Sequence, residues 1–468
     1  MKRVGTMLGV ALVLGGCVAR NAGYADVQRV TRERIGKEVR WRHVDSGGKT
    51  AELTRSLLSR PLSADSAVQL GLLNSARVQA AFADLGWARA ELVRALAIPN
   101  PTAEVAVRFR EGARADIELS AFEDLSSLLL LPLRKGAAAA ALDAAKAETA
   151  GRILDEALGI RLAFYDYQAA SQTFALRRTI LQAAHAAYSA AERMHEAGNI
   201  TDLSLANERA LYEEARIELA RAEANERALR EQLNERMGVF AEGAAWTVEA
   251  RLPDATPVAE LGPELERRAL EKSLDLQAAR QRYAAAARRS NYGRARGVIP
   301  LLRAGVSAER AEDSSFAVGP AAVVSVPLFY QGQGEVDAAS AEMQRERQLY
   351  DAEALRIRTT ARALTAKLEA LAGSAQYYQR VLLPLRDEIV QSTELEYNAM
   401  SVGIFQLLQA KREQIRAAET YVDLLRDYWS RRAEAEQLAA GRLPNASKVV
   451  GPIAVQPASS NEPSSAGH

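Results

Sequence analysis

One pattern of residues occurs twice in this chain at a nearly constant separation, and this duplication constrains the fold more than any other feature. Residues 75–81 align with 273–279, Pro101 with Pro300, 131–133 with 326–328, and 142–148 with 336–342. The offsets are 198 (273 − 75), 199 (300 − 101), 195 (326 − 131) and 194 (336 − 142). Four matches in the same order predict two repeats of one module, spanning 61–250 and 251–442.

Each repeat is predicted to contain a helix, two strands and a long helical hairpin. The first helices are expected over about 64–97 and 260–296, and the long helical runs over about 137–197 and 335–395. At 1.5 Å per residue, a helix of that length extends roughly 90 Å. Pro384 predicts a kink late in the second run. The glycine-containing segments 197–202 and 399–404 are expected to turn the chain into a further helix.

The segments after Pro101 and Pro300 alternate polar and apolar residues with a period of two, which predicts strands with one polar and one apolar face. Val105, Val107 and Val306 belong to the apolar set. The polar set consists of Glu104, Arg108, Arg110, Glu118, Arg303 and Glu309. These residues are expected to line the lumen of a pore. The competing interpretation is that they are charges exposed at turns.

Four such strands per chain are too few to close a membrane-spanning barrel, because the smallest known barrels use about eight. An open edge in lipid would leave backbone groups unpaired at a cost of several kcal/mol each. A barrel therefore requires several chains. The alternative is a four-stranded soluble sheet covered by helices.

The N-terminus favours the membrane interpretation. Lys2 and Arg3 precede an apolar run over 4–14, and the chain's single cysteine, Cys17, follows directly after Gly15-Gly16. This run is too short to span a bilayer and predicts a cleaved signal peptide over 1–16. The ending resembles a bacterial lipobox, which implies a covalent lipid on Cys17 as the only attached group and an anchored, extended tether over 17–60. A buried core cysteine is the alternative for Cys17.

Composition excludes several classes of function. Lysine plus arginine (60) nearly balances aspartate plus glutamate (59), so nothing indicates a nucleic-acid partner. The four histidines are scattered without metal-ligand spacing, so no metal site is expected. Neither a phosphate-binding glycine loop nor a catalytic constellation is evident, and the chain is not expected to be an enzyme. The segment 443–468, rich in proline and serine, is expected to be a disordered tail.

The order of these elements resembles the TolC family of outer-membrane efflux channels, over about 60–441. The resemblance rests on Asn100-Pro101, on 327–329 before Gly332 and Gly334, and on the segment 397–410. It implies a mainly α-helical fold with a small β part. Duplicated long helical hairpins would form an α-barrel, and four antiparallel transmembrane strands per chain would join a shared trimeric β-barrel.

The resemblance also implies a function and partners. Members of the family are passive homotrimeric channels that work with a periplasmic adaptor protein and an inner-membrane efflux transporter. The lipobox and residues 39–41 look more like the lipoprotein branch, which serves multidrug or heavy-metal pumps. Val18 follows the cysteine in place of the aspartate that typically retains lipoproteins in the inner membrane, and this resemblance implies sorting to the lipid of the outer membrane. The competing hypothesis is a periplasmic adaptor or structural coiled-coil lipoprotein without a pore.

In this family the hairpin turns lie at the periplasmic tip, where acidic residues often narrow the entrance. In the second repeat the matching positions are Gln406 and Gln409, and Met400 replaces the usual glycine. Asp202 of the first repeat is therefore the candidate tip carboxylate, with capping of the following helix as its alternative role. The predicted tip residues are Gly198, Thr201, Asp202, Gly403, Gln406 and Gln409.

Overall fold

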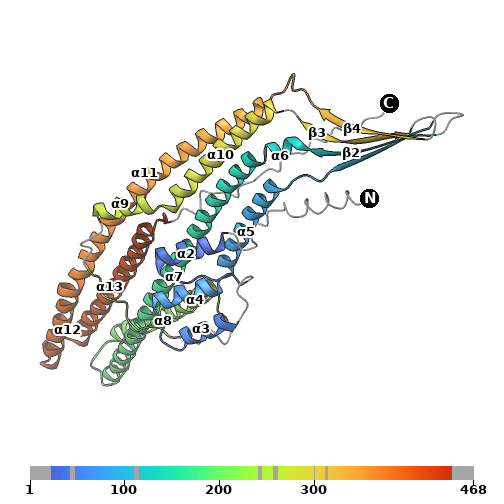
Figure 1. Ribbon diagram of the computed structural model, residues 1–468. Helices are drawn as coiled ribbons and strands as arrows, with labels where there is room; N and C mark the ends of the chain where they lie inside the picture. The colour runs from blue at the N-terminus through green and yellow to red at the C-terminus, as the bar shows by residue number, and fades with distance from the viewer. Residues whose placement is uncertain are drawn as a thin grey trace.

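The protein is an elongated bundle of helices with a small sheet at one end and two helical tips at the other (Figure 1). This computed structural model describes residues 23–42, 48–109, 115–240, 245–256, 262–299, 301–310 and 315–444. The signal segment 1–16, Cys17, Arg110 and the residues after 444 lie outside the described part.

The sheet joins the two repeats. Its strands are β1 (Thr102–Arg108), β2 (Asp116–Asp124), β3 (Leu302–Arg310) and β4 (Phe316–Val324), all antiparallel in the order β1-β2-β3-β4. Each repeat supplies one hairpin, and β2 pairs with β3 across the repeats. The predicted four antiparallel strands are confirmed, and β1 and β4 form the two open edges.

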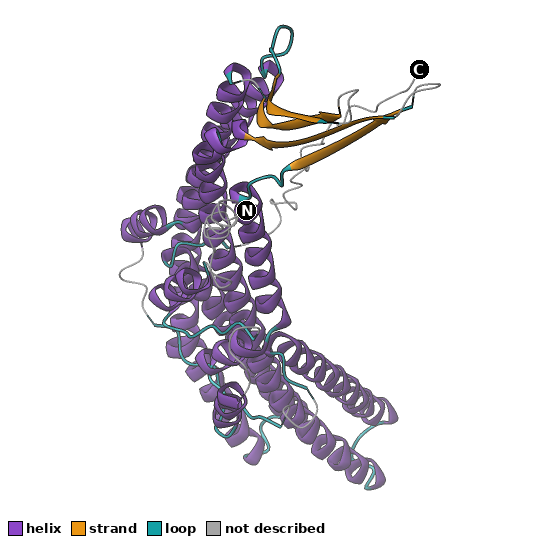
Figure 2. Ribbon diagram, turned by 45° about the vertical axis from the view of Figure 1, so that its right-hand side comes forward, coloured by secondary structure: helices purple, strands orange, loops and turns teal. Residues whose placement is uncertain are grey.

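Four helices continue the same order beneath the sheet. They are α5 (Ala76–Leu96), α7 (Leu131–Glu196), α10 (Leu274–Val298) and α11 (Gln333–Tyr377). α5 packs on α7, α7 on α10, and α10 on α11, which makes α5 and α11 the two ends of the layer (Figures 1 and 2). Small buried residues such as Ala140 and Ala144 allow α7 to approach its neighbours closely.

The first helix of each repeat is divided at a serine, where a single continuous helix was predicted. α4 (Ala64–Asn74) ends before Ser75, and α9 (Gly262–Lys272) ends before Ser273. The Ser75 hydroxyl accepts a hydrogen bond from the backbone N–H of Arg77, and the Ser273 hydroxyl accepts one from Leu276. Each serine therefore caps a new helix at the same point of the repeat.

The long hairpins differ between the repeats. α7 runs without interruption for 66 residues, roughly 100 Å, and returns through α8 (Asp202–Met237). In the second repeat a π-helical turn, Tyr378–Leu382, separates α11 from α12 (Leu383–Asn398), and α13 (Ile404–Ala439) returns. Pro384 is the second residue after this turn, so the place where a kink was predicted is the place where the helix changes from α to π and back. The ring nitrogen of Pro384 cannot donate the next helical hydrogen bond.

The N-terminal segment is not the extended tether that was expected, because it contains α2 (Tyr24–Ile35) and α3 (Gly48–Leu58). Tyr24 packs edge-on against Phe82 of α5 at 5.2 Å between ring centroids, and Trp41 stacks on the same ring at 6.1 Å. Val27 and Val39 are fully buried. These apolar and aromatic side chains hold the segment on the bundle through contacts that its polar composition concealed.

The residues just after α13 hold the two repeats together. Arg442 forms ion pairs with Asp155 of α7 and Asp275 of α10, and Leu443 is buried. Packed structure therefore continues to Pro444, two residues into the range expected as tail. Gly441, at φ 93°, lies so close to Lys272 that a Cβ would be 2.0 Å from its carbonyl oxygen. A last α-helix, α6 (Leu125–Leu129), connects β2 to α7.

Among the described helices, none combines the length and apolar character needed to cross a membrane.

Candidate functional site

The strand register gathers the predicted lumen residues on one face of the sheet. Glu104 lies opposite Ser120, and Ala106 lies opposite Glu118. Glu118 in turn lies opposite Glu309, and Asp124 lies opposite Arg303. Directly opposed residues share a face, so five predicted residues lie together. They are Glu104, Arg108, Glu118, Arg303 and Glu309.

These charges interact across the strands. Arg108 lies 3.4 Å from Glu118, and Arg303 lies 3.7 Å from Glu104. The Arg303 guanidinium also lies over the ring of Phe122, 5.5 Å from its centroid. These residues therefore form a surface of mixed charge on one face of the sheet. They lie within the paired strands and not at the turns.

The opposite face is apolar and open. Val105, Leu119, Val306 and Val318 are exposed on it, Val105 to 66% and Val318 to 67%. The sheet projects beyond the helices, which do not cover this face (Figure 2). The arrangement differs from a soluble sheet covered by helices, since the described helices leave a large apolar surface of the sheet exposed.

At the other end of the molecule, the first hairpin turn holds a close polar contact. Gly198 has a left-handed φ of 71°, and the Thr201 hydroxyl accepts a hydrogen bond from the backbone N–H of Ser204. Thr201, not Asp202, is thus the residue that caps α8. The exposed Asp202 carboxylate instead lies 2.6 Å from Nε2 of His195.

The second hairpin turn has the same backbone with different side chains. Met400 has φ 58°, in the place that Gly198 occupies in the first turn. Gly403 precedes α13 without a side-chain cap, and Gln406 and Gln409 are exposed. The two turns lie at the same end of the bundle but on separate tips (Figure 1). The only predicted carboxylate among the six tip residues is Asp202.

Two buried polar features were missed from the sequence. The first is Arg442 with Asp155 and Asp275. Burial alone would lower the pKa of Arg442, but hydrogen bonding and attraction to the two aspartates outweigh the effect of burial, so this pKa is raised. The second is Glu208 of α8, which is 2% exposed. Burial raises the pKa of Glu208, and the nearby charge of Arg412 opposes this rise. Neither feature has a local sequence signal.

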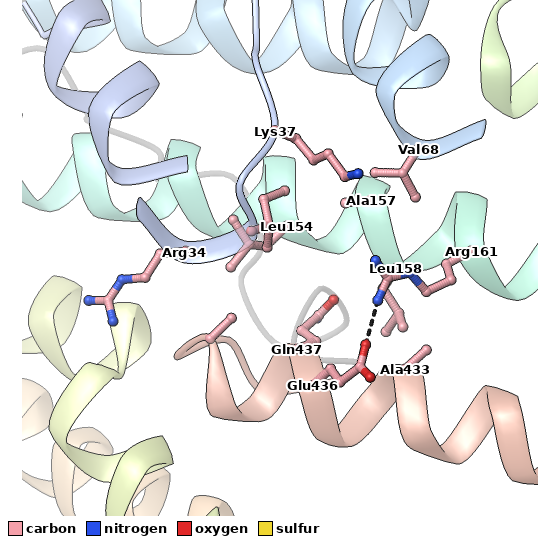
Figure 3. A pocket seen from close by; sticks show the side chains of 12 residues that line it. Arg34, Lys37, Val68, Leu154, Ala157, Leu158, Arg161, Ala433, Glu436 and Gln437 are labelled. Carbon is pink, nitrogen blue, oxygen red and sulfur yellow. Dashed lines mark hydrogen bonds and ion pairs between the residues drawn. The ribbon is translucent and has the colours of Figure 1, made fainter. Parts of the chain in front are cut away.

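A small cavity of about 220 Å³ lies between the N-terminal segment, α7 and α13 (Figure 3). Its polar lining includes Lys37 and Arg161, which both contact Asp65, and Arg161 also binds Glu436 at 2.6 Å. The carboxylates that balance these cations belong to the chain itself, so the arrangement fastens α4, α7 and α13 together.

In the part of the chain that the structure describes, no group of three histidine, cysteine or acidic side chains is placed to hold a metal ion. Of the histidines described, His185 lies beside Tyr212 on the first hairpin and His195 beside Asp202.

No family profile and no curated protein matches the sequence. Solved structures do. CusC, described for its transmembrane channel formation, superposes with a TM-score of 0.67 at 17% identity, covering 81% of this chain and 92% of CusC. The outer membrane protein VceC of Vibrio cholerae superposes with a TM-score of 0.65 at 17% identity, and the match covers 81% of this chain and 96% of VceC. The CmeC outer membrane channel of Campylobacter jejuni superposes with a TM-score of 0.65 at 13% identity, and the match covers 82% of this chain and 86% of CmeC.

The chain has the fold of these outer-membrane channels. The predicted fold, with duplicated helical hairpins and four antiparallel strands per chain, is confirmed. At identities of 13 to 17%, the likeness establishes the channel fold and leaves function to the chemistry of the chain.

Proposed function

We propose that the protein is the passive outer-membrane channel of a tripartite efflux system. It exports small molecules or metal ions from the periplasm through a homotrimeric barrel and helical tunnel. The observation that carries this proposal is the four-stranded sheet, which has one charged face, one exposed apolar face and two open edges. In a closed ring the apolar face meets lipid and the charged face lines water.

The long hairpins support the same proposal. They extend roughly 100 Å away from the sheet, a length suited to a tunnel that crosses the periplasm rather than to a compact soluble domain. A channel of this kind supplies no energy of its own. A periplasmic adaptor protein and an inner-membrane transporter would deliver the substrate to the tips, where Asp202 is the proposed tip carboxylate.

The test is conductance in planar lipid bilayers by purified full-length protein. We expect stable trimers to insert and conduct ions. A stable oligomer without conductance would instead favour the adaptor or structural lipoprotein. Glu118→Lys with Glu309→Lys should shift ion selectivity towards anions, because both residues lie on the proposed lumen face. The matched control is Arg362→Glu, an exposed change on α11 away from the sheet.

We also propose that a lipid on Cys17 anchors the protein to the outer membrane. The supporting feature is the sequence around Cys17, with its basic start, apolar run and small residues. One acyl chain gives weak, reversible binding, so several chains would be needed for firm anchoring. Metabolic labelling with a radioactive fatty acid should mark the wild-type chain and not Cys17→Ala. Label that persists in the variant would refute the assignment.

A further inference from the structure

The two outer strands of the sheet run in opposite directions. β1 and β4 are the outer strands of a sheet with four antiparallel strands, so they are antiparallel to each other. α5 and α11 are the matching ends of the helical layer (Figures 1 and 2). A second copy placed beside the first can therefore set its β1 and α5 against β4 and α11 and continue the antiparallel order.

A junction of this kind already exists inside the chain. There, β2 and α7 of the first repeat pack against β3 and α10 of the second. The repeat relates β2 and α7 to β4 and α11, and it relates β3 and α10 to β1 and α5. The contact between the repeats is thus a template for the contact between copies.

Two polar contacts define the helical part of this template. Arg288 of α10 donates a hydrogen bond to the carbonyl oxygen of Gly136 in α7 at 2.7 Å. Arg282, six residues earlier, binds Glu148 at 2.7 Å. Ala285 lies midway between the two arginines and is fully buried. Side chains three or four residues apart share a helix face, so Ala285 belongs to the face that meets α7.

On α7, Ala140 and Ala144 lie between Gly136 and Glu148 at four-residue spacing, and both are buried. Their counterparts on α11 are Gly334 (140 + 194) and Ala338 (144 + 194), and both are exposed. The counterpart of Ala285 is Trp87 (285 − 198) on α5, which is 62% exposed. The exposed indole of Trp87 and two exposed small residues, Gly334 and Ala338, thus lie at the two positions that the template brings together.

We propose that Trp87 of one copy packs onto Gly334 and Ala338 of α11 in the next copy. This inference rests on the proposed ring of chains. Burial of a tryptophan against small residues removes a large apolar area from water, and tryptophan is enriched at the centres of protein interfaces. The Arg94 guanidinium lies over the Trp87 ring, 5.7 Å from its centroid.

The first test is cross-linking of full-length protein in membranes. Trp87→Cys with Ala338→Cys, treated with a short bismaleimide, should convert the chain into covalent dimers and trimers, and neither single variant should do so. The matched control pairs Ala338→Cys with Val93→Cys, because Val93 is exposed on another face of α5. Equal or stronger cross-linking of the control pair would overturn the proposed contact.

The second measurement is the concentration at which the detergent-solubilised oligomer dissociates. Trp87→Ala should raise it by about thirtyfold, as expected for removal of an interface hot spot. Leu203→Ala, at the exposed tip, is the control and should leave it unchanged. An unchanged value for Trp87→Ala, in an oligomer that still conducts, would overturn this contact and leave the channel standing. A chain that never forms an oligomer would overturn both.

Discussion

Gly198 and Met400 hold the same left-handed backbone conformation at matching positions of the two hairpin turns, with φ 71° and 58°. Glycine adopts this conformation without steric cost, whereas a side chain makes it unfavourable by about 1 kcal/mol. Met400 is also 93% exposed, so its side chain gains little from packing.

Met400→Gly should therefore stabilise the protein by about 0.5–1 kcal/mol, since relief of strain exceeds the extra entropy of glycine in the unfolded chain. Urea denaturation of the detergent-solubilised protein measures the change. Ala399→Gly is the control, because Ala399 has an ordinary φ of −80° and should lose stability on the same substitution.

Removal of Arg442 should be strongly destabilising. Arg442→Met leaves Asp155 and Asp275 without their cation at the junction of α7 and α10, and loss of one partner from a buried ion pair costs about 3–5 kcal/mol. Thermal unfolding followed by circular dichroism measures the loss. Arg416→Met removes an exposed pair with Glu413 and should cost less than about 0.5 kcal/mol. Similar losses in the two variants would contradict the fastening role of Arg442.

Glu208 should make stability depend on pH. Burial raises the pKa of Glu208 in the folded state, so its stabilising contribution is complete when it is protonated in both states and is lost as pH rises through the folded value. Glu208→Gln should therefore raise the free energy of unfolding at pH 7 by about 1 kcal/mol and bring no gain near pH 4. Denaturant titrations at the two pH values test this. Glu214→Gln, exposed on the same helix, should show no such difference.

Asp202 should control the response of the channel to multivalent cations. Asp202→Ala removes the one predicted tip carboxylate, and block of the pore by added cations should weaken. His195→Ala is the matched control, because it removes the 2.6 Å contact and leaves the carboxylate charge in place. Bilayer conductance with increasing cation concentration distinguishes the two variants. Undiminished block in Asp202→Ala would remove this residue from the entrance.

Features with a strong period were predictable from the sequence. The alternation around Glu104 and Glu118 placed both on one face, and the glycine-containing segments 197–202 and 399–404 located both hairpin turns. Pro384 marked the place where the second long helix changes its hydrogen-bond pattern. In each case the signal is local, because backbone geometry alone relates neighbouring residues.

Features that depend on distant contacts were not predictable. Ser75 and Ser273 look like ordinary helix residues until the bend between α4 and α5, and its counterpart between α9 and α10, are seen. The helix over 24–35 is held by Phe82, more than forty residues away. Arg442 directly precedes the segment that was predicted as a disordered tail, and its partners Asp155 and Asp275 lie far away in the sequence, one in each repeat.

The sheet also limits how such a chain can evolve. Its edges run in opposite directions only because the number of strands is even, and a chain with three or five strands would present parallel edges that break the pairing pattern. Loss or gain of a single strand would therefore break the antiparallel order between copies, whereas loss or gain of a whole hairpin would keep it. In the proposed homotrimer, a hairpin gained or lost by each chain would change the ring by six strands (3 × 2), so the strand pair of one repeat is the smallest unit by which the wall can grow or shrink.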